Sequence, residues 1–376
     1  MKNTWLFLVL VLQTALSSSQ TNEIKKTPLK LAVVGMTHGH VHQVLGRGKS
    51  ADDIEIVGFV EANRDLAERL TKQYGYSSDL IYPTLNEMIS AVKPEAVAAF
   101  NSTFEHLETV RYCAPKGVHI MVEKPLAVNW EHAKEMVALA KKHKVQLLTN
   151  YETSWYGSNE KAYELIHSKQ KIGPIKRMVF HTGHQGPIEI GCNIEFLEWL
   201  TDPVLNGGGA LTDFGCYGAN LSTWLMRGES PKSITCITQN LKPKKYPKVD
   251  DDATIVVKYE KSEVIIQASW NWPHNVKDME VYGTTGYVFC KNKSDLVLLE
   301  NGKKKPIDLT AKPLPKGLND PFSILKKVVH DGYSLEAFDV TSLENNSLVI
   351  QILDAAKRSA EQGKTILWSE LYPIAE

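Results

Sequence analysis

The segment LKLAVVGMTHGH, residues 29–40, decides how the chain folds. Its first six residues form a nearly continuous apolar run, which is typical of a strand buried on both faces of a parallel sheet. Gly35 follows this run directly, and a helix is predicted to begin near Val41. A strand, a glycine turn and a helix in this order form the first unit of many nucleotide-binding α/β domains.

The same strand–helix unit recurs downstream. Repeated units of this kind require a parallel sheet with right-handed crossovers, so residues 28–150 are predicted to form a Rossmann-type domain. Further strands are predicted over 54–61, 96–100, 119–122 and 145–148, and helices over 64–74, 85–92, 104–114 and 130–143.

The pattern changes after residue 150. Residues 264–268 alternate between core-facing and outward positions, which indicates an antiparallel sheet. Residues 151–376 are therefore predicted to form a second, α+β domain that serves substrate binding and oligomerisation. Its strands are predicted over 175–182, 233–239, 253–259 and 263–269, and its helices over 159–168, 219–225 and 343–361.

The overall composition is that of a packed globular protein, with 43% hydrophobic and 23% charged residues. Lys plus Arg equals Asp plus Glu at 43 each, so the chain carries no electrostatic footprint for nucleic acid or an anionic membrane. The five cysteines are scattered without a CxxC pair, and we expect them to be small buried hydrophobic residues.

The first 19 residues read as a secretory signal peptide. Lys2 precedes an apolar run over 5–12, and small residues including the serines 17–19 follow it. The run is too short to span a bilayer, and no Cys follows it to carry a lipid anchor. We therefore expect an exported protein, periplasmic in location, without a membrane anchor.

The turn after the first strand is the predicted dinucleotide site, because helix N–H groups and the helix dipole face a diphosphate there. Of the usual G-x-G-x-x-G only Gly35 is in place, since Thr37 and His40 occupy the other two glycine positions. Glu61 ends the second strand, where a carboxylate binds ribose hydroxyls and repels a 2′-phosphate. NAD is therefore expected rather than NADP, although Arg64 nearby leaves the opposite preference open.

Three histidines in this turn, His38, His40 and His42, also permit a metal interpretation, because imidazoles are common ligands. No acidic or cysteine cluster accompanies them in the sequence, so no metal is predicted. His38, Gly39 and His40 are instead assigned to the cofactor phosphates.

Two further motifs carry the predicted chemistry. Glu123-Lys124-Pro125 follows a strand at the sheet edge where α/β folds bind ligands. The glycine-rich segment 207–217 contains Asp213 and Tyr217, which share one face if they lie on one helix.

With these motifs the chain resembles the Gfo/Idh/MocA family of sugar and polyol dehydrogenases from Leu29 to about Ser359. The phrases 172–175, 251–254, 269–270 and 282–284 look like the second domain of that family. The resemblance implies a Rossmann domain followed by an α+β domain with a large open sheet, and homo-oligomers that form through this sheet. It also implies hydride transfer between a secondary alcohol and a nicotinamide cofactor.

The resemblance assigns roles to individual residues. The family's catalytic Lys corresponds to Lys124 and its substrate-side Asp to Asp213, whereas Tyr217 replaces a common His. Because an adjacent ammonium favours a phenolate, a Tyr217–Lys124 pair is expected to act as general base. Candidate cofactor residues beyond the turn are Asn101, His106 and Glu123, and candidate substrate residues with rings that suit sugars are His181, His184 and Trp155.

The sequence thus predicts an oxidoreductase that acts on a sugar, polyol or glycoside. Because free NAD is scarce outside the cytoplasm, we expect a tightly held cofactor. One alternative is a glycosidase- or epimerase-like enzyme with a transient ketone. Another is a non-catalytic sugar-binding protein, against which the joint presence of Lys124, Asp213 and Tyr217 argues.

Overall fold

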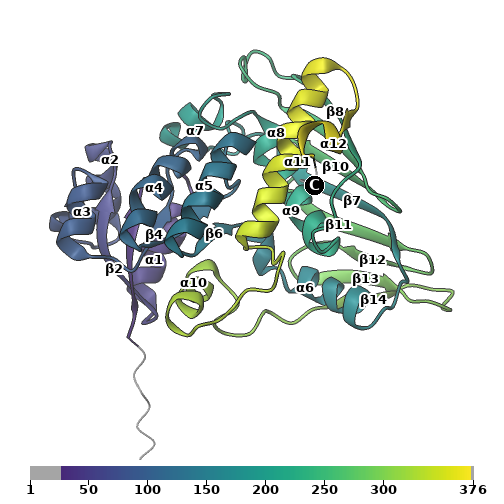
Figure 1. Cartoon of the computed structure of the whole chain (residues 1–376), viewed down its shortest axis with the longest axis horizontal. Helices are drawn as coiled ribbons and strands as arrows, with labels where there is room; N and C mark the ends of the chain where they lie inside the picture. The colour runs from purple at the N-terminus through teal and green to yellow at the C-terminus, as the bar shows by residue number, and fades with distance from the viewer. Residues whose placement is uncertain (1–26, 374–376) are drawn as a thin grey trace, which may run out of the picture.

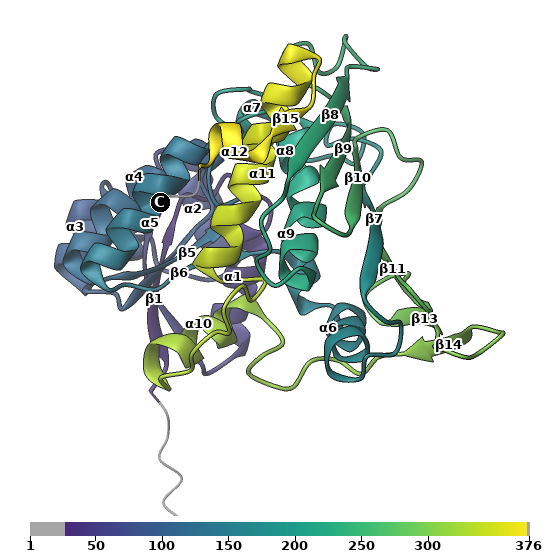
Figure 2. The same ribbon diagram turned by 45° about the vertical axis from the view of Figure 1, so that its right-hand side comes forward.

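A computed structural model describes residues 27–373, so the predicted signal peptide lies outside the described residues. The described chain forms two sheets, the first covered by helices on both faces and the second on one face. The long helix α11 (Leu343–Gln362) lies between the two sheets (Figures 1 and 2). This helix contacts α5 (Trp130–His143) of the first layer and α9 (Gly215–Leu225) of the second.

The first sheet is parallel throughout and has the strand order β3-β2-β1-β4-β5-β6, which confirms the Rossmann prediction. Its strands are β1 (Leu29–Val34), β2 (Ile54–Val60), β3 (Ile81–Tyr82), β4 (Ala96–Ala99), β5 (His119–Glu123) and β6 (Leu147–Asn150). Besides α5, its helices are α1 (Val41–Ser50), α2 (Arg64–Gln73), α3 (Leu85–Val92) and α4 (His106–Cys113), with the short turns η1 (Ser78–Leu80), η2 (Thr103–Glu105) and η3 (Ala114–Lys116).

Alternate residues of β1 point into two different cores, as expected for a strand covered on both faces. Ala32 and Val34 pack in a cluster with residues of α3, α4 and α5. Leu31 and Val33 pack in a second cluster with residues of α1 and α2. Continuous apolar sequence is therefore what this position requires.

Helix α10 (Pro321–His330) belongs to the predicted second domain by its place in the sequence, but it packs against the first sheet. Phe322 and Leu325 of this helix join the cluster on the α1 and α2 face of the Rossmann sheet. Asp320 caps the helix, and its carboxylate also pairs with Arg47 of α1 at 3.0 Å. The chain thus returns to the first sheet late in the sequence, which no local pattern signals.

The second sheet has nine strands in the order β14-β13-β12-β11-β7-β10-β9-β8-β15, and all its pairings are antiparallel except β7 with β10. This confirms the predicted mainly antiparallel sheet. Its strands are β7 (Ile175–Gly183), β8 (Ser233–Gln239), β9 (Asp252–Lys258), β10 (Glu263–Ser269), β11 (Val276–Gly283), β12 (Tyr287–Cys290), β13 (Asp295–Leu299), β14 (Ile307–Thr310) and β15 (Ile366–Leu367).

Helices gather on one face of this sheet, and Figures 1 and 2 show its other face bare across the described residues. Strand residues such as Val264 and Ile266 are buried against the helices, whereas alternate residues are partly exposed. The helical elements besides α9 and α11 are η4 (Glu152–Trp155), α6 (Gly157–Tyr163), the π-helical η5 (Glu164–Ser168), α7 (Ile194–Leu200), α8 (Ala210–Asp213) and α12 (Trp368–Leu371).

None of the helices within residues 27–373 combines the length and the apolar character that crossing a bilayer needs. The five cysteines are all unpaired, and four of them are buried as the sequence predicts. The exception is Cys192, which is half-buried in the loop that leads into α7.

Candidate active site

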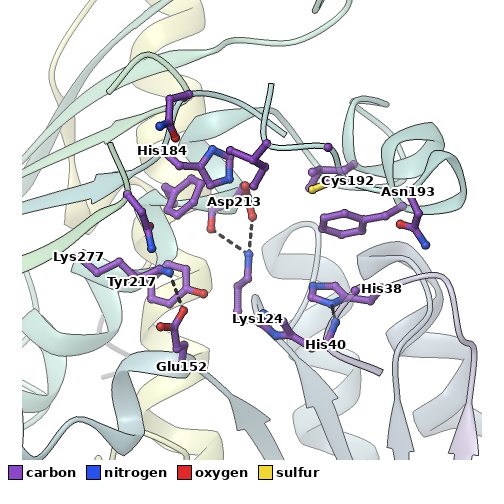
Figure 3. A pocket seen from close by; sticks show the side chains of 18 of the residues that line it. His38, His40, Lys124, Glu152, His184, Cys192, Asn193, Asp213, Tyr217 and Lys277 are labelled. Atoms are coloured by element: carbon purple, nitrogen blue, oxygen red, sulfur yellow. Dashed lines mark hydrogen bonds and ion pairs between the residues drawn. The ribbon is translucent and has the colours of Figure 1, made fainter. Parts of the chain in front are cut away.

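The carboxyl ends of the parallel strands meet at one edge of the Rossmann sheet, and the predicted polar residues gather there. Gly35 follows β1, Glu61 follows β2 and Lys124 follows β5. Asn150 is the last residue of β6, and Glu152 lies two residues beyond it. The second domain faces this edge with Asn193, which precedes α7, with Asp213 of α8 and with Tyr217 of α9 (Figure 3).

The centre of the site is a buried ion pair between Lys124 and Asp213, with side chains only 7% and 5% exposed. The Lys124 ammonium also donates to the Asp213 backbone oxygen at 3.2 Å. The other Asp213 carboxylate oxygen accepts from Trp270 Nε1 at 3.0 Å. Both carboxylate oxygens are thus held, which fixes the ammonium in one position.

The electrostatics keep both partners of this pair charged. Burial by itself would raise the pKa of Asp213, but Lys124 lowers it below its ordinary value. Burial would likewise lower the pKa of Lys124, but Asp213 raises it above its ordinary value. Lys124 therefore presents an ammonium, which donates hydrogen bonds to an oxygen that gains negative charge.

The glycine-rich segment before Asp213 is held in place by Asp250, which lies just before β9. The Asp250 carboxylate accepts from the amides of Gly209 and Leu211 at 2.9 and 2.7 Å. A Cβ on Gly209 would lie 1.8 Å from the Asp250 backbone oxygen, so only glycine permits this approach. Asp250 thus anchors the start of α8, the four-residue helix that ends at Asp213.

Tyr217 lies in the same site, but not in the arrangement predicted from its spacing. Phe214 separates α8 from α9, so Asp213 and Tyr217 sit on two helices rather than on one helix face. The Lys124 ammonium lies 5.3 Å from the centroid of the Tyr217 ring, and the Lys277 ammonium lies 5.4 Å from it. Figure 3 shows Tyr217 between these two lysines.

The prediction that Tyr217 is held as a phenolate is wrong. Burial raises the pKa of Tyr217 well above its ordinary value, and the carboxylates of Glu152 and Asp213 add to the shift. The nearby ammonium groups do not reverse this effect, because each is already paired with a carboxylate. Tyr217 is therefore a neutral phenol, a hydrogen-bond donor beside the Lys124 ammonium.

These residues line a cavity of about 540 Å³ between the two domains. The predicted residues that the cavity unites are His38, Gly39, His40, Lys124, His184, Asp213 and Tyr217. Burial lowers the pKa of His184 to about 4, and its Nδ1 accepts from the Gly186 amide at 2.9 Å. Its remaining proton is therefore on Nε2, which makes the ring a neutral donor.

Two candidate substrate residues do not line this cavity. His181 lies on β7 and pairs with Asp278 at 2.8 Å, because β7 and β11 are neighbours. Trp155 donates from Nε1 to Asn150 at 3.0 Å and packs against the Rossmann core. Contacts within the protein, rather than with a substrate, explain the positions of both side chains.

A second cavity of about 390 Å³ lies on the other side of the glycine turn. Four predicted cofactor residues line it: Gly35, Thr37, Glu61 and Asn101. Gly35 has a φ of +73°, which suits glycine, and a Cβ at Gly39 would meet nothing within 4 Å. Thr37 lines this second cavity and His40 lines the first one. The two side chains that replace the usual glycines therefore leave open space on both sides of the turn.

The Glu61 carboxylate in the lining of this second cavity suits the ribose end of NAD. The two Glu61 carboxylate oxygens accept from the amides of Met36 and Asn63 at 2.6 and 2.8 Å. This holds a negative charge beside the cavity that would repel a 2′-phosphate. Arg64 does not line the cavity and pairs with Glu68 on the surface of α2.

The histidine turn does have an acidic neighbour, contrary to the sequence argument. His40 Nδ1 lies 2.9 Å from a Glu123 oxygen, and the ligand atoms of His38, His40 and Glu123 lie within 4.8 Å of one another. His38 Nδ1, however, accepts from the His40 amide at 3.0 Å, so its ring proton is on Nε2. His42 is not part of this group: its Nδ1 lies 2.9 Å from the Tyr74 hydroxyl, although its side chain also lines the first cavity. Hydrogen bonds join His38 to the His40 amide and His40 to Glu123.

Two more predicted cofactor residues support the site from behind. Glu123 accepts from His40 and from Asn150 Nδ2, the latter at 2.7 Å. Burial by itself would raise the pKa of Glu123, but His40 and the hydrogen bond from Asn150 lower it to about 2. His106 is fully buried, and its Nδ1 lies 3.2 Å from the Leu126 oxygen. It lines neither cavity, so it packs beneath the Lys124 loop rather than facing a cofactor.

Sequence reasoning missed three parts of the site. Glu152 could have been found, because it follows β6 at the same sheet edge as the other polar residues. Lys277 lies on β11 and α7 lies in a loop-rich region, and neither carries a local signal. Helix α7 closes over the turn, since Trp199 Nε1 donates to Thr37 Oγ1 at 3.1 Å and Phe196 lies 4.7 Å from the His38 ring.

Two family models match the chain. The model of an oxidoreductase family with an NAD-binding Rossmann fold, GFO_IDH_MocA, matches residues 29–151. The model of the GFO/IDH/MocA C-terminal domain matches residues 160–289. The two matches together cover about two thirds of the chain and both predicted domains.

Individual relatives include dehydrogenases of diols and sugars. Trans-1,2-dihydrobenzene-1,2-diol dehydrogenase of Xenopus tropicalis is 26% identical over 262 residues, which cover 67% of this chain and 74% of that protein. D-glucoside 3-dehydrogenase of Escherichia coli (strain K12) is 24% identical over 210 residues, which cover 55% and 57%.

Among solved structures, the aldose-aldose oxidoreductase of Caulobacter crescentus complexed with glycerol superposes with a TM-score of 0.76 at 20% identity, over 90% of this chain and 99% of that chain. This likeness shows that the two-domain fold is shared. The family matches confirm the resemblance inferred from the motifs and the expected NAD cofactor. The chain belongs to the GFO/IDH/MocA family of NAD-binding oxidoreductases.

Proposed function

We propose that the protein transfers a hydride between NAD and a secondary alcohol of a sugar, polyol or glycoside. The observation that carries this proposal is the buried Lys124–Asp213 pair beside Tyr217, in a cavity that adjoins the glycine turn. NAD supplies the hydride acceptor when it is bound. The protein's part is to hold the alcohol and stabilise the charge on its oxygen.

Lys124 and Tyr217 are the two donors for that oxygen. In the transition state of hydride transfer the substrate oxygen has alkoxide character, and an ammonium and a phenol that are already oriented stabilise it. Asp213 does not exchange protons in this scheme, since both its oxygens are occupied by Lys124 and Trp270. It acts by holding the ammonium in place.

The substrate class follows from the rest of the cavity and from the relatives. Charged and polar side chains suited to several hydroxyls line the walls: Glu152, Lys277, His184, Gln185, Asn193 and Asn275. The named relatives act on a vicinal diol and on a D-glucoside, both of which present a secondary alcohol beside another oxygen. A polyhydroxylated substrate suits this lining better than an apolar alcohol.

We further propose that the protein is exported to the periplasm through its first 19 residues, retains NAD between turnovers and forms homo-oligomers. Export supports retention, because a freely exchanging enzyme would lack cofactor there. The contact of α7 with the glycine turn, made by Trp199 and Phe196, supports slow release.

A direct test is to denature the purified protein lacking residues 1–19 and analyse what it releases by mass spectrometry and by absorbance in the reduced-nicotinamide band. We expect about one NAD or NADH per chain, in keeping with a single Rossmann turn. Release of nothing, together with no binding of added NAD in a titration, would refute the oxidoreductase proposal and favour the sugar-binding alternative.

The pH dependence should differ between the two directions of reaction. Alcohol oxidation releases the hydroxyl proton, which must pass to Tyr217 or Lys124 after that group has lost its own proton to solvent. Burial raises the pKa of Tyr217 and Asp213 raises that of Lys124, so both groups hold their protons at neutral pH. The base form therefore grows with pH, and we expect kcat/KM for oxidation to rise steadily between about pH 6 and pH 9. Ketone reduction, which uses the protonated forms, should not fall over this range. A plateau of the oxidation rate near neutral pH would contradict the assignment.

A further inference from the structure

Residues 184–193 lead from β7 to α7 and form part of the wall of the cavity that contains Lys124, and we call them the rim segment. Ile188 and Ile190 of this segment, and Ile194 directly after it, have exposed side chains. None of the three belongs to either hydrophobic core of residues 27–373. A single exposed apolar side chain is ordinary, but three isoleucines within seven residues make an apolar surface of the kind that marks a binding site.

Polar contacts hold the rim segment in one conformation. The Glu189 carboxylate pairs with the ammonium groups of Lys242 and Lys245, each at 2.9 Å. The Ile190 amide donates to the Gly186 backbone oxygen at 3.0 Å, which closes a turn within the segment. The exposed position of Ile190 is therefore built into the fold before any ligand binds, and a surface that is already ordered costs less entropy to occupy.

Ile190 connects this apolar surface to the site of hydride transfer. It lines the same cavity as Lys124 and Tyr217, but those two residues are buried, whereas Ile190 is 49% exposed. The reacting groups thus lie at the closed end of the cavity and Ile190 at its open end. Figure 3 shows Cys192 and Asn193 of the rim segment on the side of Lys124 opposite Tyr217. A molecule that contacts Lys124 and extends toward solvent therefore has its outer part beside Ile190.

We infer that the substrate is a glycoside with an apolar alkyl or aryl aglycone, and that Ile190 selects it. The inference rests on the proposed function and narrows its substrate class. A free sugar or an inositol carries an oxygen on every ring carbon, so it offers no apolar surface to cover Ile190. A glycoside has its hydroxyls at one end and its aglycone at the other, in the same order as the polar closed end and the apolar open end of the cavity.

An aglycone bound at the open end should change substrate binding and leave the chemical step unchanged. It does not touch the reacting carbon, so its contact with Ile190 is the same in the bound substrate and in the transition state. Such uniform binding lowers the substrate concentration needed for half-saturation without raising the limiting rate of hydride transfer. This division between the two parameters distinguishes a rim contact from an effect of the aglycone on the reaction itself.

The test measures a single turnover, so that a retained cofactor does not limit the rate. The protein is loaded with NAD⁺, and absorbance follows the formation of bound NADH after a substrate is added. The substrates are the methyl, butyl and phenyl glycosides of glucose, galactose and xylose in both anomeric forms, together with the free sugars and myo-inositol. The limiting rate and the half-saturating concentration are determined for each compound.

For the sugar that reacts fastest, we expect the half-saturating concentration to fall at least about 10-fold from the methyl to the butyl and phenyl glycosides, with limiting rates within about 2-fold of one another. In Ile190→Asn, which replaces apolar by polar surface at the open end, this fall should shrink to less than about 3-fold. Ile307→Asn is the matched control, because Ile307 is 51% exposed on β14 and lies outside the cavity. The control should keep the wild-type preference.

Other results would overturn the inference. Equal half-saturating concentrations for the methyl, butyl and phenyl glycosides, or for a free sugar, would remove the aglycone contact and leave the proposed function standing. A wild-type preference that persists in Ile190→Asn would place the aglycone elsewhere. If that variant also had a different mass in light scattering, the isoleucines would be a contact between two copies of the chain. A wild-type protein whose bound NAD⁺ is reduced by no compound of the set would refute the proposed function, and this inference with it.

Discussion

Replacing Lys124 with Met is expected to slow hydride transfer by about 100- to 1,000-fold, the usual effect of losing one oriented donor to a developing oxyanion. The same change should lower the free energy of unfolding by about 3–5 kcal/mol, because it leaves the Asp213 carboxylate buried without its charge partner. The Asp213 side chain is only 5% exposed, so water can replace the ammonium only in small part. Steady-state rates and thermal unfolding measure the two effects.

A double variant separates catalysis from stability. Lys124→Met combined with Asp213→Asn removes the charge together with its partner, and Trp270 can still donate to the amide oxygen. We expect most of the lost stability to return while the rate stays low. A Lys124→Met protein with wild-type activity would exclude Lys124 as the donor, and one with unchanged stability would show that Asp213 takes up a proton instead.

The second large effect is expected for Gly35→Ala, which should prevent NAD from binding. Gly35 has a φ of +73°, and a Cβ there would lie 2.5 Å from the Asn101 backbone nitrogen and 2.6 Å from its Cα. The turn after β1 and the end of β4 must then move apart, and the second cavity lies between them. We expect a loss of stability above the roughly 1–3 kcal/mol of backbone strain alone, and no NAD released on denaturation.

Gly75→Ala provides the matched control for this prediction. Gly75 has a φ of +71°, but a Cβ there would meet nothing within 4 Å. The two variants therefore share the backbone strain and differ in the clash. We expect Gly75→Ala to keep its bound NAD, and the difference in unfolding temperature measures the cost of pushing β1 and β4 apart. Equal behaviour of the two variants would show that the clash relaxes without moving the cofactor turn.

Much of the first domain could be predicted from sequence because its signals are local. A parallel strand covered on both faces must be apolar throughout, so 29–34 and 96–99 were recognisable without any partner. Helices α3 and α5 were predicted with their observed bounds, and in the structure Thr84 and Asn129 are their N-caps. Strands β11 to β14 escaped prediction, because strands with mixed polar and apolar residues take their stability from neighbours in the sheet.

The sequence alone determined which strands end in polar residues, and hence that Gly35, Glu61 and Lys124 share one sheet edge. Asp213 was expected near this edge only through the family resemblance. The tertiary structure alone decided that Lys277 and α7 also face it, because they belong to segments far along the chain. It also decided the protonation of Tyr217, since burial, which no local pattern records, outweighs the charge of a neighbouring lysine. Periodicity and motifs report the backbone near a residue, whereas desolvation and charge pairing depend on every group that the fold packs around it.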